Sequence, residues 1–336
     1  MRICVYDVAA ESGGALTILN RYYRKALSDK QNEYLFIIGL PELASVDNIS
    51  VMRCPEVKRS WINRILFDWF KAPRMIRDFG AEEVLSLQNV LVPRIESRQI
   101  VYMHNVLPKP LCDYRFGLRD SPKMWVYQNI VGRLIVDSCR KADGVVVQTH
   151  WLARRLSERC GVESSRISVE SVGEEIVAWS RRLKTSVFTF VYPASAEPFK
   201  NHQVVVDACR LLKSQKVGGF KVVFTLDGTE NALSERLREQ CRLESLPIEF
   251  AGWMEKEEIA HMYASASCLL FPSKLESWGL PLSEAKEYSL PIIVSDLEYA
   301  HETIGEYERV HYFDQSDEGQ LAFRMKNVLL EAGKNG

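Results

Sequence analysis

The chain has 336 residues, a length that suggests two domains of ordinary size. Its 46% hydrophobic and 26% charged residues are typical of a globular protein and exclude a disordered chain. The net charge of −1 divides into +6 over residues 1–172 and −7 over the remainder. The N-terminal half is therefore expected to contact an anionic partner, such as a lipid pyrophosphate or a membrane surface.

The cysteines and the chain start predict a cytoplasmic protein. None of the eight cysteines forms a CxxC pair, so they are expected to be reduced core thiols. The six histidines have no metal-ligand spacing, and we expect no metal site. The first residues, MRICVYDVAA, lack the apolar core of a signal peptide, and no apolar run is long enough to span a membrane.

The first half is predicted to alternate strands and helices. Residues 2–7 form an expected strand, after which Gly13 and Gly14 open a helix whose N-terminus could receive a phosphate. His104 directly follows the expected strand 98–103, so it is placed at the sheet edge where ligands bind, or else it is a satisfied loop histidine. The irregular segment 107–120 is expected to be an acceptor-side loop. The other predicted elements are strands over 34–39, 49–53, 83–87 and 144–148, helices over 122–141 and 149–160, and a final stretch over 167–172.

Segment 58–77 is predicted to be a basic amphipathic helix. Apolar residues follow helical spacing at Trp61, Ile62, Ile65, Leu66, Trp69 and Phe70, and they are surrounded by Lys58, Arg59, Arg64, Lys71, Arg74 and Arg77. Such a helix can lie in a membrane interface. The alternative is a helix that packs on the sheet and leaves its basic residues solvated.

The second half also alternates strands and helices, which predicts a parallel, doubly wound α/β sheet. Residues 173–186 are expected to connect the domains, and helices are expected over 200–214 and about 317–332. The expected strands cover 187–192, 221–226, 248–251, 268–271, 291–295 and 310–313. We therefore divide the chain into a first domain over 1–172, a second domain over 173–316 and a C-terminal helix over 317–336.

The stretch 268–302 carries the strongest functional signal. It reads as a buried strand, a polar loop with Glu276, a short helix with Glu284 and a second buried strand. Glu284 follows Glu276 by eight positions, and eight residues of helix would rise roughly 12 Å, about the scale of a nucleotide-sugar. The amides of Gly279 and Leu280 would then face a diphosphate. Two solvated surface glutamates are the alternative interpretation.

The string FPSKLESWGLPLSEA resembles the Glu-x₇-Glu signature of retaining glycosyltransferases of family 4. The resemblance implies the GT-B architecture, two Rossmann-like domains that face each other across a cleft. It makes 1–172 the acceptor-side domain and 173–316 the nucleotide-sugar-binding domain, with the C-terminal helix 317–336 crossing back to the first domain. It implies sugar transfer with retention and without a metal or cofactor, from a UDP- or GDP-sugar to a glycan or lipid-pyrophosphate-linked acceptor. The expected setting is cell-surface polysaccharide synthesis, such as O-antigen or capsule, at the inner face of the cytoplasmic membrane.

The resemblance also implies roles for individual residues. His104, Lys200 and Glu276 are the implied catalytic residues: His104 and Glu276 hold sugar hydroxyls, and Lys200 stabilises the leaving diphosphate. Glu284 holds the ribose. The other implied donor-binding positions are Gly13, Gly14, Ser195, Gly252, Trp253, Met254, Ser277, Trp278, Gly279 and Leu280.

Two neighbouring positions depart from the family pattern. The family usually has an arginine where this chain has Ser195, and a glycine where it has Ala194. The second cation for the diphosphate is therefore missing from its usual place. This departure keeps a non-catalytic nucleotide-sugar-binding protein as an alternative. A sugar-nucleotide epimerase of the same fold is another, although the string SWGLPLSEA argues against it.

Overall fold

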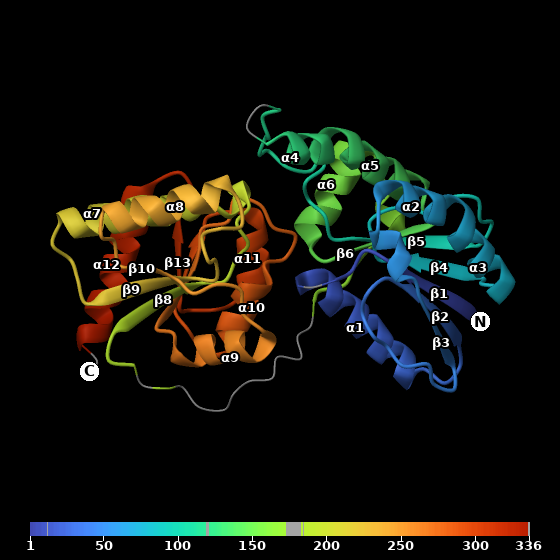
Figure 1. The fold of residues 1–336 in the computed structure, drawn as a ribbon, viewed down its shortest axis with the longest axis horizontal. Helices are drawn as coiled ribbons and strands as arrows, with labels where there is room; N and C mark the ends of the chain where they lie inside the picture. The colour runs from blue at the N-terminus through green and yellow to red at the C-terminus, as the bar shows by residue number, and fades with distance from the viewer. Residues whose placement is uncertain (12, 119–120, 173–182, 184, 335–336) are drawn as a thin grey trace. The chain divides into compact units, whose positions relative to one another are not determined.

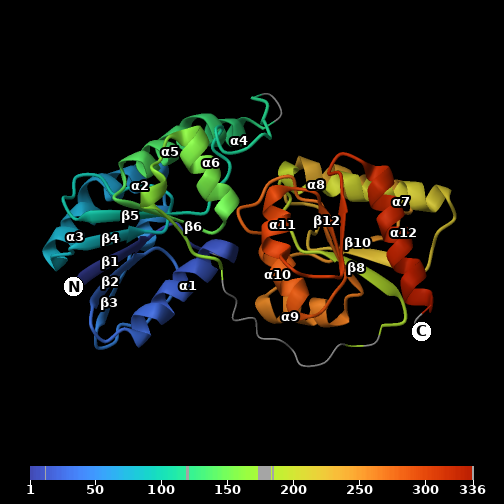
Figure 2. The same ribbon diagram turned by 180° about the vertical axis from the view of Figure 1, so that it is seen from behind.

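A computed structural model gives the fold of the chain (Figures 1 and 2). It describes residues 1–11, 13–118, 121–172, 183 and 185–334. The chain divides into two compact units, Met1–Val172 and Gly173–Gly336, which we call unit 1 and unit 2. Most of the expected interdomain connection, 173–186, lies outside the described residues.

Unit 1 is built on a parallel sheet. Over the described residues it has seven strands in the order β3-β2-β1-β4-β5-β6-β7, and each neighbouring pair is parallel. The chain starts in the middle of the sheet and changes direction between β1 and β4, which makes the carboxyl ends of these strands a ligand-binding edge. The strands are β1 (Arg2–Asp7), β2 (Glu33–Ile38), β3 (Ile49–Arg53), β4 (Glu83–Ser86), β5 (Arg98–Met103), β6 (Gly144–Val147) and β7 (Ile167–Val169).

Helices cover both faces of this sheet. Figures 1 and 2 show α1 (Gly13–Ser28) on one face and α2 (Trp61–Leu66), α3 (Ala72–Phe79) and α5 (Gly132–Lys141) on the other. The remaining segments are α4 (Pro122–Val126), α6 (His150–Cys160), the 3₁₀ turns η1 (Pro55–Lys58) and η4 (Ser164–Arg166), and the π-helical turns η2 (Phe67–Lys71) and η3 (Tyr127–Val131). The predicted helix 122–141 is therefore interrupted by a π-helical turn.

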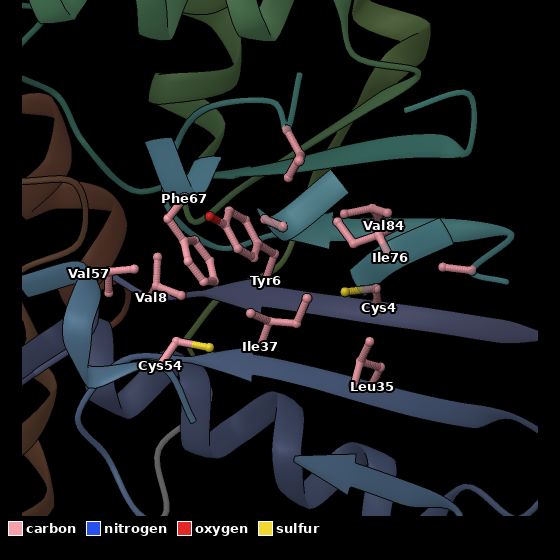
Figure 3. Packing of buried hydrophobic residues seen from close by; sticks show 13 residues of the cluster. Cys4, Tyr6, Val8, Leu35, Ile37, Cys54, Val57, Phe67, Ile76 and Val84 are labelled. Carbon is pink, nitrogen blue, oxygen red and sulfur yellow. The ribbon is translucent and has the colours of Figure 1, made fainter. Parts of the chain in front are cut away.

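The segment from α2 to α3 has a packed inner face and an exposed outer face. Ser60 caps α2 by accepting the Asn63 N–H at 3.1 Å. Pro73 has no N–H for the helical ladder, and in the turn before it the Ala72 N–H donates to the Phe67 carbonyl. Phe67 and Ile76 belong to a buried cluster with residues of β1, β2 and β4 (Figure 3). The alternative of a helix packed on the sheet is thus correct for the inner face.

Unit 2 repeats the same design. Its six described strands run in the order β10-β9-β8-β11-β12-β13, and all described pairs are parallel. All four residues of β11 and of β12 are buried, as expected for strands covered on both faces. The strands are β8 (Phe188–Tyr192), β9 (Phe220–Phe224), β10 (Ile248–Phe250), β11 (Cys268–Phe271), β12 (Ile292–Ser295) and β13 (Val310–Phe313).

The helices of unit 2 also lie on both faces. Figures 1 and 2 show α7 (His202–Ser214) and α8 (Ala232–Leu243) on one face and α9 (Lys256–Ser265) and α10 (Leu280–Glu287) on the other. The unit also has the 3₁₀ turn η5 (Pro198–Lys200), α11 (Glu298–Ile304) and α12 (Glu318–Lys334). α12 packs along α7 and against β12 and β13. The expectation that this helix crosses back to the first domain stays a prediction.

The structure tests the predictions about the cysteines and about membrane-spanning segments. All eight cysteines are buried and unpaired with one another, which confirms the expected core thiols. No helix among the described residues is long and apolar enough to cross a membrane.

Candidate functional site

The candidate site of unit 2 lies where its strand order reverses. β8 and β11 are neighbours at this point, and loops 193–201 and 272–279 follow them at the carboxyl edge of the sheet. Lys200 lies in the first loop and Glu276 in the second. In doubly wound sheets this edge is where ligands bind.

Hydrogen bonds fix the two loops to each other. The buried Asn201, with φ of 59°, donates its side-chain amide to the Pro272 carbonyl at 3.1 Å and to the Gln315 carbonyl at 2.8 Å. The Tyr192 hydroxyl holds the Lys200 carbonyl at 2.6 Å, and the Lys274 N–H donates to the Phe199 carbonyl at 2.8 Å. The backbone that carries Lys200 and Glu276 is therefore held in place before any ligand binds.

Lys200 and Glu276 form an ion pair. Lys200 Nζ lies 2.5 Å from Glu276 Oε1, and the two side chains are only 18% and 14% exposed. The sequence predicted both residues for the site but did not predict that they pair. The ammonium and the carboxylate thus largely neutralise each other.

Gly279 and α10 provide a helix N-terminus at the same edge. Gly279 has a φ of 86°, and an added Cβ would lie 3.2 Å from both Phe271 and Leu282, so only glycine fits there. The helix begins at Leu280, with Pro281 in its first turn. Next to it, the Trp278 indole donates to Ser283 Oγ at 2.9 Å, and Thr303 donates to the Trp278 carbonyl at 2.5 Å.

The two glutamates lie in the elements that the sequence predicted, a loop and a short helix. Glu276 lies in the loop and Glu284 lies in α10, so only part of the eight-residue interval is helical. The physical reason is Gly279, whose left-handed backbone stops a regular helix from starting earlier. The 12 Å rise therefore does not describe the separation of these carboxylates.

Glu284 is a restrained, half-buried carboxylate. Its Oε2 accepts the Tyr263 hydroxyl at 2.7 Å, and Tyr263 stacks on Tyr288 with ring centroids 5.6 Å apart. Burial raises the pKa of Glu284, while the Tyr263 hydrogen bond and the charge of Lys256 oppose the rise. Tyr263 was not predicted from the sequence, since one tyrosine in a helix gives no signal of a carboxylate partner.

The other donor-side residues lie at the same sheet edge. Gly252 follows the edge strand β10 with a φ of 84°, and its N–H donates to the Leu226 carbonyl at 3.0 Å. Trp253, the next residue, is 71% exposed, and Met254 is half-buried. Their part in base binding stays a prediction.

Ser195 leaves its loop without the family's second cation, and Lys274 on the neighbouring loop is another candidate. Ser195 is exposed, and the preceding Ala194 N–H donates to Thr225 Oγ1 at 3.1 Å. Lys274 lies two residues before Glu276 on the loop bonded to Phe199. Burial lowers the pKa of Lys274. The sequence analysis did not single out Lys274, although it stands inside the motif FPSKLE.

In unit 1, the candidate residues lie at the carboxyl ends of β1, β4 and β5. Gly13, with a φ of 58°, begins α1, and both Gly13 and Gly14 are exposed. The nearby Asp7 accepts the Ala9 and Ala10 N–H groups at 3.2 and 3.0 Å. Burial raises the pKa of Asp7 to about 6. The phosphate-binding role of the glycines stays a prediction.

His104 follows β5 and is held by Asn89, the third residue after β4. The Asn89 Oδ1 accepts the His104 N–H at 2.9 Å, and its Nδ2 lies 3.3 Å from His104 Nε2. Burial lowers the pKa of His104 to about 4, so the ring is neutral at pH 7. Asn89 was missed because a single asparagine after a strand resembles an ordinary turn residue.

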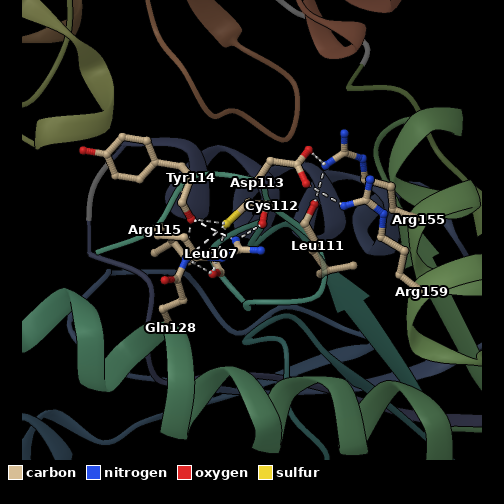
Figure 4. A network of polar contacts seen from close by, with 9 residues as sticks. All are labelled: Leu107, Leu111, Cys112, Asp113, Tyr114, Arg115, Gln128, Arg155 and Arg159. Carbon is tan, nitrogen blue, oxygen red and sulfur yellow. Dashed lines mark hydrogen bonds and ion pairs between the residues drawn. The ribbon is translucent and has the colours of Figure 1, made fainter. Parts of the chain in front are cut away.

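The expected acceptor-side loop is ordered over its described part, 107–118 (Figure 4). Arg155 donates to the Leu111 carbonyl at 2.8 Å, and Arg159 donates to Asp113 at 2.8 Å. Gln128 donates to the Tyr114 carbonyl at 2.8 Å, while the Tyr114 ring points away from the network (Figure 4). Residues 119–120 lie outside the described residues, and the acceptor role of the loop stays a prediction.

Comparisons with known proteins place the fold. Residues 174–335 match the family "Glycosyl transferases group 1". The O-antigen chain mannosyltransferase RfbU of Salmonella typhimurium (strain LT2) is 22% identical over 268 residues, which cover 78% of this chain and 69% of that protein. Sucrose-phosphate synthase from Thermosynechococcus elongatus matches the structure with a TM-score of 0.74 at 15% identity, over 98% of this chain and 90% of that one. Anabaena HepE in complex with UDP and glucose matches with a TM-score of 0.74 at 14% identity, over 99% and 91%.

The two parallel α/β units and these structural neighbours show the GT-B fold, as predicted. The family match covers nearly all of unit 2, from residue 174 to residue 335.

Proposed function

We propose that the chain is a retaining glycosyltransferase that needs no metal and moves a sugar from a nucleotide-sugar to a glycan or lipid-linked acceptor in cell-surface polysaccharide synthesis. The observation that carries the proposal is the Lys200–Glu276 pair at the strand-order reversal of a group 1 unit. The similarity to an O-antigen chain mannosyltransferase supports the setting. No cluster of three His, Cys, Asp or Glu residues that could hold a metal occurs among the described residues.

The proposed reaction is attack on the face from which the diphosphate leaves. The acceptor oxygen forms a bond to the anomeric carbon while the bond from that carbon to the phosphate oxygen breaks. The acceptor proton passes to the departing phosphate oxygen. The protein supplies position and charge complementarity in this step, because no side chain has to act as nucleophile. Glu276 would hold sugar hydroxyls and Glu284 the ribose, and the Gly279 and Leu280 amides would face the diphosphate.

Lys274 is proposed to supply the second positive charge that Ser195 lacks. Lys200 alone is largely neutralised by Glu276 at 2.5 Å, so a diphosphate needs a further cation. Lys274 lies on the loop that is hydrogen bonded to the residue before Lys200. Its lowered pKa indicates a partly desolvated ammonium, which gains from an anionic ligand.

Unit 1 is proposed to contact an anionic membrane through the outer face of α2 and η2. Trp61, Ile62 and Ile65 are 77%, 69% and 55% exposed. Arg94 lies over the exposed rings of Trp69 and Phe70, at 5.2 and 4.9 Å from their centroids. Aromatic area together with basic charge favours reversible interfacial binding, with about 1 kcal/mol per well-placed Lys or Arg.

A thermal-shift screen against UDP-, GDP-, ADP- and TDP-sugars tests the proposed activity, since a bound donor stabilises the fold by mass action. The stabilising donor is then tested for transfer to lipid-pyrophosphate acceptors with and without EDTA, and the anomeric configuration of the product is read by NMR. Glu284→Ala should weaken donor binding, whereas Glu276→Ala should lower turnover more than binding. Donor binding without transfer or hydrolysis would favour a binding protein, and an epimerised donor in the absence of acceptor would favour an epimerase.

A further inference from the structure

Asn89 occupies a constrained position at the carboxyl end of β4. Its backbone has a φ of 66°, a left-handed conformation that asparagine tolerates better than most residues, and its side chain is 5% exposed. The preceding Gln88 accepts the Arg64 guanidinium at 2.7 Å, and Arg64 in turn pairs with Asp68 at 2.7 Å. Asn89 is therefore held in place from the side of α2.

Two backbone donors set the orientation of the Asn89 amide. Its Oδ1 accepts the His104 N–H at 2.9 Å and the Asn105 N–H at 3.1 Å. An NH₂ group in this place would face two N–H donors, which excludes the flipped amide. The donor Nδ2 must consequently be the atom that lies 3.3 Å from His104 Nε2.

This orientation determines the state of the imidazole. Because Nδ2 can only donate, His104 Nε2 must be the acceptor, and in a neutral ring the proton then resides on Nδ1. Burial lowers the pKa of His104 to about 4, which keeps the ring neutral at pH 7. His104 Nδ1 is buried and has no hydrogen-bond partner among the described residues.

We propose that Asn89 is a positioning residue that holds His104 as the Nδ1–H tautomer, so that the ring donates a hydrogen bond to a substrate oxygen and does not act as a general base. The proposal rests on the glycosyltransferase function proposed above and deepens it. Nε2 is occupied by Asn89 and Nδ1 already carries a proton, so neither nitrogen is available to take the acceptor's proton. A sugar hydroxyl oxygen is the expected partner, because it would satisfy an N–H that is otherwise unpaired.

The ring tautomer can be measured directly on the ligand-free protein. In the full chain labelled with ¹⁵N-histidine, long-range ¹H–¹⁵N spectra distinguish a protonated Nδ1 from a protonated Nε2, and His104→Gln assigns the His104 signals. We expect the Nδ1–H tautomer in the wild type. A protonated Nε2 in the wild type would overturn the proposal, and this measurement needs neither substrate nor a site variant of Asn89. Its outcome is therefore independent of whether a transfer activity is found.

Asn89→Asp tests the causal role of the amide. The carboxylate keeps acceptors for both backbone N–H groups but removes the donor facing Nε2, so the tautomer should change to Nε2–H. We expect kcat to fall about tenfold or more, with the donor KM changed less than threefold. The matched control is Asn129→Asp. The Asn129 amide donates to the Trp125 carbonyl at 2.9 Å and makes no contact with His104 among the hydrogen bonds described. This variant should leave the tautomer of His104 and kcat unchanged. An unchanged tautomer in Asn89→Asp, or a changed tautomer with wild-type kcat, would overturn the proposal.

Discussion

Lys200→Ala tests the ion pair at the centre of the candidate site. At the observed 2.5 Å and an effective dielectric constant of about 20, the gross attraction of the two charges is about 7 kcal/mol. Desolvation offsets most of it, and removal of one partner from a fully buried pair costs about 3–5 kcal/mol. Because the side chains keep 18% and 14% exposure, we expect the free energy of unfolding to fall by about 2–3 kcal/mol.

The matching double variant isolates the interaction. Lys200→Ala combined with Glu276→Ala removes the unpaired carboxylate, so its free energy of unfolding should lie above that of Lys200→Ala alone. We expect a coupling energy of about 1–2 kcal/mol from urea unfolding of the four proteins. A coupling below about 0.5 kcal/mol would refute the electrostatic account of the pair.

The same variant tests the chemistry. Single preorganised groups that stabilise developing charge contribute on the order of 10²–10³-fold to turnover, and we expect a loss of this size for Lys200→Ala in the transfer assay. The physical reason is that the loop 193–201 has no second Lys or Arg that could take over from Lys200, because Ser195 stands where the family has arginine. A loss of less than fivefold would mean that other groups hold the leaving diphosphate.

Three further predictions follow from the structure. Lys274→Met should weaken the binding of UDP or GDP, measured by calorimetry, more than the binding of UMP or GMP. Adding Ser195→Arg to this variant should restore diphosphate binding. Equal losses of affinity for the diphosphate and the monophosphate would contradict a role of Lys274 at the diphosphate. Wild type should sediment with anionic liposomes at low salt and be released at high salt, and sedimentation should fall on charge reversal to Glu at three exposed basic positions, Arg59, Lys71 and Arg74. Arg64 is spared in that variant because it pairs with Asp68 and Gln88 inside unit 1, and unchanged sedimentation would remove the membrane role. The free energy of unfolding should fall less between pH 6.5 and 4.5 in His202→Phe than in the wild type. If urea unfolding at each pH gives the same pH dependence for both proteins, this prediction is refuted.

The sign of the last prediction comes from burial. His202 is 1% exposed between the rings of Tyr192 and Phe224, and neither ring nitrogen has a partner among the described residues. Burial, and secondarily the charge of Lys200, lowers the pKa of His202 to about 3. The native protein therefore favours the neutral ring, and that contribution is present above the unfolded pKa of about 6.5 and is lost as the pH falls. Phenylalanine cannot titrate and should fit the aromatic site.

The fold class could be predicted from the sequence because it depends on local signals. The apolar run 268–271 matches β11 at both ends, since a strand buried on both faces needs a continuous apolar run. The end of a helix could be predicted where a single residue terminates it. Gly161, for example, ends α6 with a φ of 69°. The order of strands and helices then favours a doubly wound sheet.

Segment 58–77 shows a feature that local sequence signals could not predict, the direction of its basic side chains. Its sequence predicted an amphipathic helix with six basic residues around an aromatic face, but it could not say which basic residue turns inward. Arg64 is bonded to Asp68 and Gln88, while Phe67 and Ile76 fill the core (Figure 3). The direction of a long side chain depends on partners from β4 and its loop, which are distant along the chain.

The sequence by itself determined that Lys200, Glu276 and His104 would lie in loops after parallel strands, because a β–α repeat sends every such loop to the same edge of its sheet. Only the tertiary structure decided how these side chains are paired. The Lys200–Glu276 contact joins residues 76 positions apart, and the Asn89–His104 contact joins residues 15 apart on neighbouring strands. Such pairings require both strands to be in register and both loops to be bent, at Asn201 and at Asn89, into left-handed turns that residue spacing does not reveal.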